Sequence, residues 1–390
     1  MARGLNNRYI KAIMENHLPI DLIGLSREEL IGEMAAAGEK PFRAKQVWHW
    51  IYHHGETDFA AMTTLSKAAR HKLARRYVVG RPEIAQRRDS ADGSAKWLLR
   101  FADGNEAEAV FIPEDDRGAL CVSSQVGCTS KCSFCYTGTQ LLVRDLTAAE
   151  IVGQVMAARD AIGEWRRPKG ERMLSNVVVM GMGEPLFNFD QVAKALNIIM
   201  DPEGISISKR RITLSTSGVV PLIERCGREL GVNLAVSLHA ANDELRNQLL
   251  PINRKYPLAQ LLEACRRYPG ANNARRITFE YVMLDGVNDS AQDARALARL
   301  VEGVPAKFNL LPFNQWPGAP YQCSSHRAMR RFSKILNDHG YSAPIRLPRG
   351  RDIMAACGQL RSASRRESLS RLKARRRAGI EDEFHHSPAE

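Results

Sequence analysis

The sequence contains no long uninterrupted apolar run, and its amino-terminal stretch is polar. A membrane-spanning helix needs about 20 mostly apolar residues, and a secretory signal needs an apolar core behind a charged start. We therefore expect a cytoplasmic protein with no membrane span and no secretory signal. Internal repeats and long low-complexity stretches are also missing, so we expect an ordinary globular chain.

Cysteine is scarce, and acidic residues are outnumbered by basic ones. Eight cysteines among 390 residues are too few for a disulfide-stapled scaffold and favour reduced, metal-linked thiols. The formal net charge of +13 and the pI near 9.5 indicate a polyanionic partner, with nucleic acid first and an anionic membrane surface second. A basic surface that serves only solubility is the alternative. The chain length predicts two or three domains.

Three of the cysteines form a CxxxCxxC motif: Cys128, Cys132 and Cys135. Cysteine thiolates are the usual ligands of a [4Fe–4S] cluster, and three of them leave the fourth iron open to a small molecule. An open metal position is typical of a catalytic site, whereas a closed one is structural. Zinc is an alternative, but it would need a fourth ligand nearby and no histidine lies in this loop. Three ordinary core cysteines are the other alternative.

Residues 1–90 predict a small helical domain that contacts RNA. Ser26 and Glu29 form a capping box at the start of one helix. A second helix carries Trp48 and Trp50 among basic residues, and a third, from Ser66, is rich in lysine and arginine. Basic residues mixed with aromatics suit an RNA backbone and stacked bases. For the aromatics we favour a structural core, and for the basic face we favour RNA contact.

The rest of the chain divides into a β-hairpin connector (residues 91–116), a domain of alternating strands and helices (117–360), and a basic tail (361–390) whose last dozen residues we expect to be disordered. Repeated strand–helix units indicate parallel strands wound as a barrel or an open sheet. The expected strands of this domain are 120–123, 176–180, 211–216, 233–238, 277–284, 308–313 and 344–347, and expected helices are 148–161, 258–267 and 291–302.

Polar groups follow several of these expected strands, where such folds gather reactive side chains. The turn Gly181-Met-Gly-Glu-Pro185 has two glycines that let backbone approach a ligand, and Glu184 can accept hydrogen bonds from a ligand ammonium. Ser215, the Ser237-Leu-His239 segment and Asn314 lie at later strand ends and could bind a ribose, a carboxylate and an adenine. Capping of the following helix is the alternative for each of them.

Two further cysteines stand apart from the motif. Cys121 lies on the strand that precedes the cysteine loop, and Cys357 lies beside Gly358. Arg349 and Arg351 are near Cys357 in sequence and could lower its pKa, which would make it a nucleophile. The alternative is that both cysteines are small buried hydrophobic residues.

Together these motifs, with the segment Ala356-Cys-Gly-Gln-Leu360, resemble the RlmN-type radical S-adenosylmethionine (SAM) RNA methyltransferases over residues 38–360. The resemblance implies an α/β fold, a radical-SAM partial (β/α) barrel with a small N-terminal helical RNA-binding domain. It also implies methylation of C2 of an adenine in 23S large-subunit ribosomal RNA and of an adenine in tRNA. Cfr-type enzymes share the cysteines but methylate C8. The N-terminal segment and the flanks of Cys357 favour C2.

The resemblance also implies a role for each matching position. Cys128, Cys132 and Cys135 would hold the [4Fe–4S] cluster, and two SAM molecules would be used per turnover. The SAM-binding positions would be Gly183, Glu184, Ser215, Ser237, Leu238, His239 and Asn314. An external electron donor such as flavodoxin would reduce the cluster, and the protein would be a monomer.

Cys357 would carry the methyl group, Cys121 would resolve the intermediate and leave a disulfide, and Glu108 would accept a proton. This route suits the chemistry of adenine C2, which lies between two ring nitrogens and is electron-poor. Such a carbon does not attack a sulfonium methyl, so a radical on the Cys357 methyl group would add to C2 instead. Disulfide formation then requires the two sulfurs to come within bonding reach. Tyr136 and Asp145 depart from the family pattern, and neither has an implied role.

Overall fold

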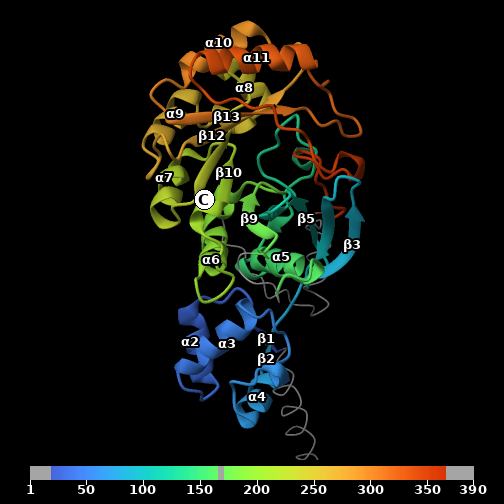
Figure 1. Ribbon diagram of the computed structural model, residues 1–390, viewed down its shortest axis with the longest axis vertical. Coiled ribbons are helices and arrows are strands. Elements are labelled where there is room, and N and C mark those ends of the chain that lie inside the picture. The colour runs from blue at the N-terminus through green and yellow to red at the C-terminus, as the bar shows by residue number, and fades with distance from the viewer. Residues whose placement is uncertain (1–18, 166–170, 366–390) are drawn as a thin grey trace, which may run out of the picture.

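A nine-stranded mixed sheet organises the computed structural model, which describes residues 19–165 and 171–365 (Figure 1). The basic run expected beyond residue 365 lies outside the described residues. The strand order is β13-β12-β11-β10-β9-β6-β5-β4-β3. The strands are β3 (Glu83–Asp89), β4 (Ala95–Arg100), β5 (Glu106–Pro113), β6 (Gly118–Cys121), β9 (Leu174–Val179), β10 (Ile212–Thr216), β11 (Asn233–Ser237), β12 (Ile277–Met283) and β13 (Ala306–Pro312).

Six strands of this sheet pair in parallel, in the order β6, β9, β10, β11, β12 and β13, and helices connect them. Strand β12 is buried at every position, as expected for a parallel strand covered on both faces. Helix α11 buries Met329, Phe332 and Leu336, which recur at helical spacing. The predicted alternation of strands and helices is therefore confirmed. The helices are α5 (Ala148–Ala161), α6 (Phe189–Met200), α7 (Val220–Glu229), α8 (Asp243–Leu249), α9 (Leu258–Arg266), α10 (Ala291–Leu300) and α11 (His326–Asp338).

The other end of the sheet, from β3 to β6, is antiparallel and continuous with the parallel half. The predicted hairpin forms, as β4 and β5. Residues 83–89, which we had placed in the small helical unit, instead form the edge strand β3. Nearly every residue of β3 is exposed and charges dominate it, which is typical of a protected edge strand. It therefore lacks the apolar alternation by which a strand is identified in sequence.

The expected strand at residues 344–347 is wrong. This segment makes a single bridge, Leu310 with Ile345, beside the edge strand β13. The Leu310 N–H donates to the Pro344 carbonyl at 3.0 Å, and the Arg346 N–H donates to the Leu310 carbonyl at 2.9 Å. Pro344 and Pro348 flank these contacts and have no N–H, so the ladder cannot continue.

The N-terminal part of the described chain forms a small unit below the sheet domain in Figure 1. It contains α2 (Arg27–Ala36), α3 (Phe42–Tyr52), α4 (Lys67–Ala74) and a two-stranded sheet of β1 (Ile20–Asp21) with β2 (Tyr77–Val78). The capping box predicted for α2 is present. Trp48 is buried, which agrees with a structural role for that aromatic. Within the described ranges, we find no helix with the length and apolar character of a membrane span.

Arg246 on α8 joins the ends of two central parallel strands. Its side chain is fully buried. It donates to the carbonyls of Leu238 at 3.1 Å, Ser217 at 2.7 Å and Ser237 at 2.9 Å, and to Oδ1 of Asn253 at 2.6 Å. These carbonyls follow or end β10 and β11. Arg246 therefore stabilises the edge of the sheet at which the strands end.

Replacement of Arg246 by leucine tests this role. We expect Arg246→Leu to lower the free energy of unfolding by about 3 kcal/mol or more, because the Ser217 and Ser237 carbonyls and Oδ1 of Asn253 lose a donor and each unsatisfied group costs about 1–3 kcal/mol. Urea unfolding followed by circular dichroism measures the change. The matched control is Arg225→Leu on α7; the Arg225 side chain is 41% exposed, so this substitution should leave the free energy of unfolding almost unchanged. Equal effects of the two substitutions would contradict the role of Arg246.

Candidate active site

A cavity opens at the carboxyl ends of the parallel strands and encloses about 980 Å³, including its mouth. Its wall contains side chains from the cysteine loop, from the ends of β9 to β13 and from the loop of Cys357. The residues predicted from the sequence that line it are Cys128, Cys132, Cys135, Gly183, Glu184, Ser215, Ser237, His239, Asn314 and Cys357. Leu238, Cys121 and Glu108 are not among the residues that line it.

The cysteine loop follows β7 (Gln125–Val126), which pairs with β8 (Arg144–Asp145) and closes the loop at its base. All three cysteines face the cavity. Burial raises the pKa of the Cys128 thiol to about 12 and raises those of Cys132 and Cys135 as well. No three His, Cys, Asp or Glu side chains of the described chain are placed to hold a metal ion as they stand. The fit to a cluster therefore rests on the donor set, three buried thiols that open into one cavity.

The two glycines of the 181–185 turn are required by packing inside the protein. A Cβ on Gly183, whose φ is +103°, would lie 2.6 Å from the Cβ of Gln125. A Cβ on Gly181 would lie 2.7 Å from Oγ of Ser123 and 2.8 Å from the backbone of Val122. Only glycine lets this turn lie against the 122–125 segment, and this contact sets the turn at the wall of the cavity.

Glu184 is buried at the end of this turn and already has protein partners. One carboxylate oxygen accepts from the N–H of Ser217 at 2.6 Å and from its Oγ at 2.7 Å, and the other accepts from the Leu186 N–H at 3.1 Å. Burial raises its pKa, and the bonds from Ser217 oppose that shift. A side-chain hydrogen bond from Thr216 also stabilises the charged form of Glu184, which lines the cavity.

His239 presents a neutral ring to the cavity. Its Nδ1 accepts a hydrogen bond from the Val282 N–H at 3.0 Å, so the proton of the neutral ring lies on Nε2. Burial, together with the charge of Arg246, lowers its pKa to about 3. His239 also has a positive φ of 60°, a conformation that the surrounding contacts must impose. Leu238 beside it is fully buried, so only its backbone is near the site.

Asn314 links the cavity to the loop of Cys357. Its Nδ2 donates to the Cys357 carbonyl at 3.1 Å, and its Oδ1 accepts from Nε of Arg351 at 2.8 Å. Ser215 and Ser237, which are half-buried, line the same cavity from β10 and β11. These three polar side chains thus lie where the sequence placed them, at strand ends, although Asn314 also positions a protein loop.

Cys357 is accessible through the cavity, but its thiol is not activated in the way that the sequence suggested. The surrounding protein raises its pKa to about 11 through burial first and then through the charges of Glu280 and Cys135. The expected lowering by neighbouring arginines is wrong, because both have other partners. Arg349 contacts Asp92 and the Pro113 carbonyl, and Arg351 binds Asn314.

Cys121 is buried on β6, and its pKa is raised by burial and by the nearby Cys357 thiol. The electrostatic effect of Cys357 places the two thiols within range of each other's charge, although their positions are remote in sequence. All eight cysteines are free thiols in this structure, so the expected disulfide is not present.

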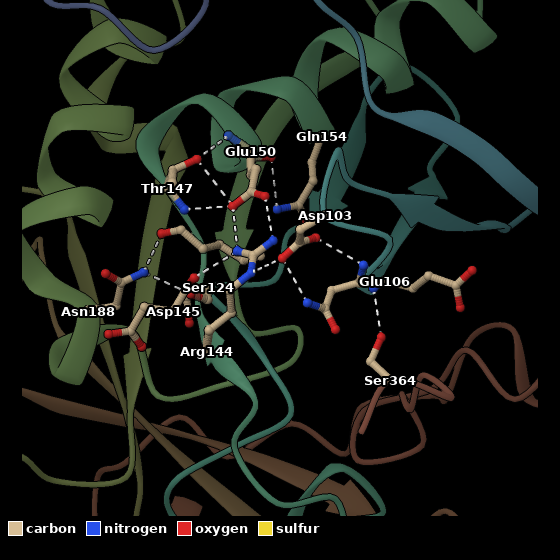
Figure 2. Close-up of polar contacts among 12 residues, drawn as sticks. Asp103, Glu106, Ser124, Arg144, Asp145, Thr147, Glu150, Gln154, Asn188 and Ser364 are labelled. Carbon is tan, nitrogen blue, oxygen red and sulfur yellow. Dashed lines mark hydrogen bonds and ion pairs between the residues drawn. The ribbon is translucent and has the colours of Figure 1, made fainter. Parts of the chain in front are cut away.

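The segment that follows Cys357 is held against the cysteine loop. The Tyr136 N–H donates to the Gly358 carbonyl at 2.7 Å, and Oγ1 of Thr137 donates to the Leu360 carbonyl at 2.5 Å. Further along, the Glu106 N–H donates to Oγ of Ser364 at 2.8 Å, beside the ion pairs of Arg144 with Asp103 and Glu150 (Figure 2). These contacts fix the loop of Cys357 over the cavity.

The sequence reasoning missed Glu280, a carboxylate that lines the cavity from the middle of β12. It lies in register with Ser237 on one side and with Asn309 on the other, and Nδ2 of Asn309 donates to it at 2.9 Å. Burial raises its pKa to about 7. A charged residue inside an otherwise apolar run was the available signal, since such a residue is rarely buried without a function or a partner.

This fold and site define a radical SAM protein: a parallel sheet with a three-cysteine loop after its first parallel strand and a Gly-Glu turn after the next. The Radical SAM superfamily matches residues 122–298, and the ribosomal RNA large subunit methyltransferase N-terminal domain matches residues 20–79. The crystal structure of a radical SAM methyltransferase from Sphaerobacter thermophilus superposes with a TM-score of 0.82 at 46% identity, covering 88% of this chain and 99% of that one.

Curated relatives are similar over almost the whole chain. The dual-specificity RNA methyltransferase RlmN of Rhodospirillum rubrum is 68% identical over 379 residues, which cover 97% of this chain and 88% of that protein. The protein of the same name in Paramagnetospirillum magneticum is 66% identical over 94% of this chain and 81% of that protein. The chain belongs to the RlmN family of dual-specificity RNA methyltransferases. The predicted family and fold are confirmed.

Alkylation of Cys357 tests its raised pKa. Only a thiolate reacts readily with iodoacetamide, and below a pKa of about 11 the thiolate fraction rises about tenfold with each pH unit. We therefore expect the alkylation rate of Cys357 to rise about tenfold with each pH unit from pH 7 to pH 9.5. Peptide mass spectrometry on the anaerobic cluster-loaded protein measures this rate. Glutathione in the same solution is the control, and its alkylation rate should level off near its ordinary thiol pKa. A plateau for Cys357 at the same pH would contradict the raised value.

Proposed function

We propose that this protein methylates C2 of an adenine in 23S ribosomal RNA, and of an adenine in tRNA, with Cys357 as the carrier of the methyl group. One observation carries the proposal: Cys357 faces the cavity that the three loop cysteines and the 181–185 turn share, and Cys121 lies within range of its charge. The relatives' name, dual-specificity RNA methyltransferase, supports more than one RNA substrate. The match of residues 20–79 supports large-subunit ribosomal RNA as one of them.

The cofactors would be a [4Fe–4S] cluster and SAM, which when bound supply the methyl group and the one-electron chemistry that an electron-poor ring carbon requires. Cys128, Cys132 and Cys135 would hold the cluster. Glu184 would accept from a ligand ammonium, and the Nε2 proton of His239 would be donated to a ligand acceptor. The other SAM-contacting positions would be Gly183, Ser215, Ser237, the backbone of Leu238, and Asn314. An external donor of the flavodoxin class would supply electrons.

The protein's own residues would do the rest of the chemistry. The Cys357 sulfur would take up a methyl group and lose its thiol proton. Glu108, on the sheet face beside Cys121, would accept the proton released from C2 after the carbon is attached. Cys121 would then lose its thiol proton and attack the Cys357 sulfur, so that an S–S bond forms while the bond from sulfur to the transferred carbon breaks. That carbon would take up a proton to become the methyl group of the product, the electron left over from the radical addition would pass to the bound cluster, and the two cysteines would be left as a disulfide.

The N-terminal unit would contact RNA through its basic face. On α4, Lys67 and His71 are exposed, as is Arg75 at its C-cap, while Ala69 and Leu73 are buried. Such a split places positive charge toward solvent, as phosphate contact requires. We further propose the division into an RNA-binding unit that ends before β3, a connector that ends at residue 116, a catalytic domain at 117–360 and a basic tail. We also propose a monomer in the cytoplasm without membrane contact.

Nucleoside analysis of modified RNA tests the activity. We expect anaerobic protein with SAM and reductant to produce 2-methyladenosine, identified by mass spectrometry against 2-methyl and 8-methyl standards. Cys357→Ala should produce none, because the carrier is lost. Cys121→Ala should accumulate a covalent protein–RNA adduct, visible as a slow band on a denaturing gel. Cys323→Ala, a half-buried cysteine outside the cavity, is the matched control. Free turnover by Cys121→Ala would refute its resolving role, and 8-methyladenosine would refute C2.

Anaerobic reconstitution tests the cofactor. We expect about four irons per chain and a change in the electronic spectrum when SAM is added, because the open iron gains a ligand. Cys132→Ala should lose most of this iron, while Cys323→Ala should keep it. Tight binding of zinc with no effect of SAM would instead support a structural metal site in an RNA-binding protein.

A further inference from the structure

Lys96 is a buried cation that the proposed mechanism does not use. It lies on β4 and is 6% exposed. Its Nζ forms an ion pair with Oε1 of Glu108 at 2.8 Å and donates to the Met354 carbonyl at 2.9 Å. A lysine is rarely buried unless it is paired, because its ammonium loses its hydration. The two partners of Lys96 belong to different parts of the fold, a central strand and the segment before Cys357.

Strand register places Lys96, Glu108 and Cys121 on one face of the sheet. Lys96 lies opposite Val110 of β5, and Val110 lies opposite Cys121 of β6. Residues directly opposite in antiparallel strands share a face, and so do residues two apart on one strand. Glu108, two residues before Val110, therefore shares this face with Cys121 and Lys96.

The segment that carries Cys357 crosses this face, and the ion pair holds it at two points. On one side of Cys357, the Met354 carbonyl accepts from Lys96. On the other side, the Arg361 N–H donates to Oε2 of Glu108 at 2.9 Å. Both carboxylate oxygens of Glu108 thus have a partner: Oε1 pairs with Lys96, and Oε2 accepts from the Arg361 N–H. Cys357 lies between the two attachment points.

We propose that the Lys96–Glu108 ion pair is a two-point tether that positions Cys357 against Cys121, with Lys96 as a positioning residue. The inference rests on the proposed function, because it explains how a carrier and a resolving cysteine remote in sequence are kept within bonding reach. A flexible loop would present the Cys357 sulfur to Cys121 at a low effective concentration, and two fixed ends raise that concentration. Burial raises the pKa of Glu108, and the Lys96 ammonium opposes this shift. Loss of the lysine would therefore also neutralise the acceptor that holds Arg361.

The equilibrium of the Cys121–Cys357 disulfide with glutathione measures this effect without catalysis. In the exchange, glutathione disulfide first forms a mixed disulfide with one cysteine and releases one glutathione. The second cysteine then attacks that sulfur, loses its proton, and releases the second glutathione. Two protein thiols are oxidised and one glutathione disulfide is reduced. The equilibrium constant is the effective concentration of one thiol at the other.

The experiment uses the cluster-loaded protein in anaerobic glutathione buffers, with acid quenching, differential alkylation and peptide mass spectrometry. We expect Lys96→Met to lower the equilibrium constant about tenfold or more. Lys96→Arg, which keeps a cation able to donate to both partners, should stay within about threefold of the wild type. Arg100→Met is the matched control: Arg100 lies on the same face of β4 and forms ion pairs with Glu83 and Glu106, but it is 44% exposed.

The outcomes separate the tether from the proposed function. A Lys96→Met protein whose constant equals that of the wild type overturns the tether, while the cysteine pair stands. A wild-type protein that forms no Cys121–Cys357 disulfide in any buffer overturns the resolving pair itself. If Lys96→Met does not fold, the same equilibrium constant is measured for Glu108→Gln. This variant keeps an acceptor for the Arg361 N–H but loses the charge that pairs with Lys96. An unchanged constant in Glu108→Gln overturns the tether, and a loss of about tenfold supports it.

Discussion

The parallel pairing of β6 with β9, and of each later strand with the next as far as β13, brings the carboxyl ends of six strands to a single edge of the sheet. Parallel strands cannot end in tight hairpins, so each is followed by a loop that must satisfy its own backbone groups. Arg246 supplies donors for three such carbonyls, and Glu184 accepts from the loop after β10. The polar groups at this edge therefore satisfy the backbone of the loops whether or not a ligand is bound. The cavity lies where these loops leave space between them.

A second constraint comes from the antiparallel half of the sheet, across which the last described segment returns. Without β4 and β5 there would be no face on which Lys96, Glu108 and Cys121 align. Without the contacts of Asn314 and Tyr136, the loop of Cys357 would not lie over the cavity. The active site thus needs both halves of the sheet. The parallel half provides the cysteine loop and the ligand-binding strand ends. The antiparallel half provides the face on which Cys121 and the loop of Cys357 lie.

Much of the fold follows from local patterns, because amphipathic helices and apolar parallel strands carry strong periodic signals. Helix α5 begins and ends at the residues expected. The misses have physical causes. Strand β3 is an exposed edge with no apolar alternation, and the segment 344–347 begins with a proline and is followed by another. In the site, strand-end residues could be named from sequence. Glu280 was missed although its charge inside an apolar strand is a local signal. The importance of Lys96 depends on which strands become neighbours, and a single sequence does not encode that locally.

The pKa values of the thiols show why residues that are near Cys357 only in sequence led to a wrong prediction of its reactivity. Arginines near Cys357 in sequence favoured a thiolate, but both arginines are used to hold the loop. The pKa of Cys357 is raised instead, although its side chain is exposed to the cavity. The loop cysteines behave in the same way, since burial raises the pKa of all three. A site of this kind keeps its thiols protonated until a cation or a proton acceptor arrives. Glu280, whose pKa burial raises to about 7, is the charged group with the largest electrostatic effect on Cys357. The reactivity of these thiols therefore depends on the ligand or ion that enters the cavity. The fold places the thiols but does not lower their pKa.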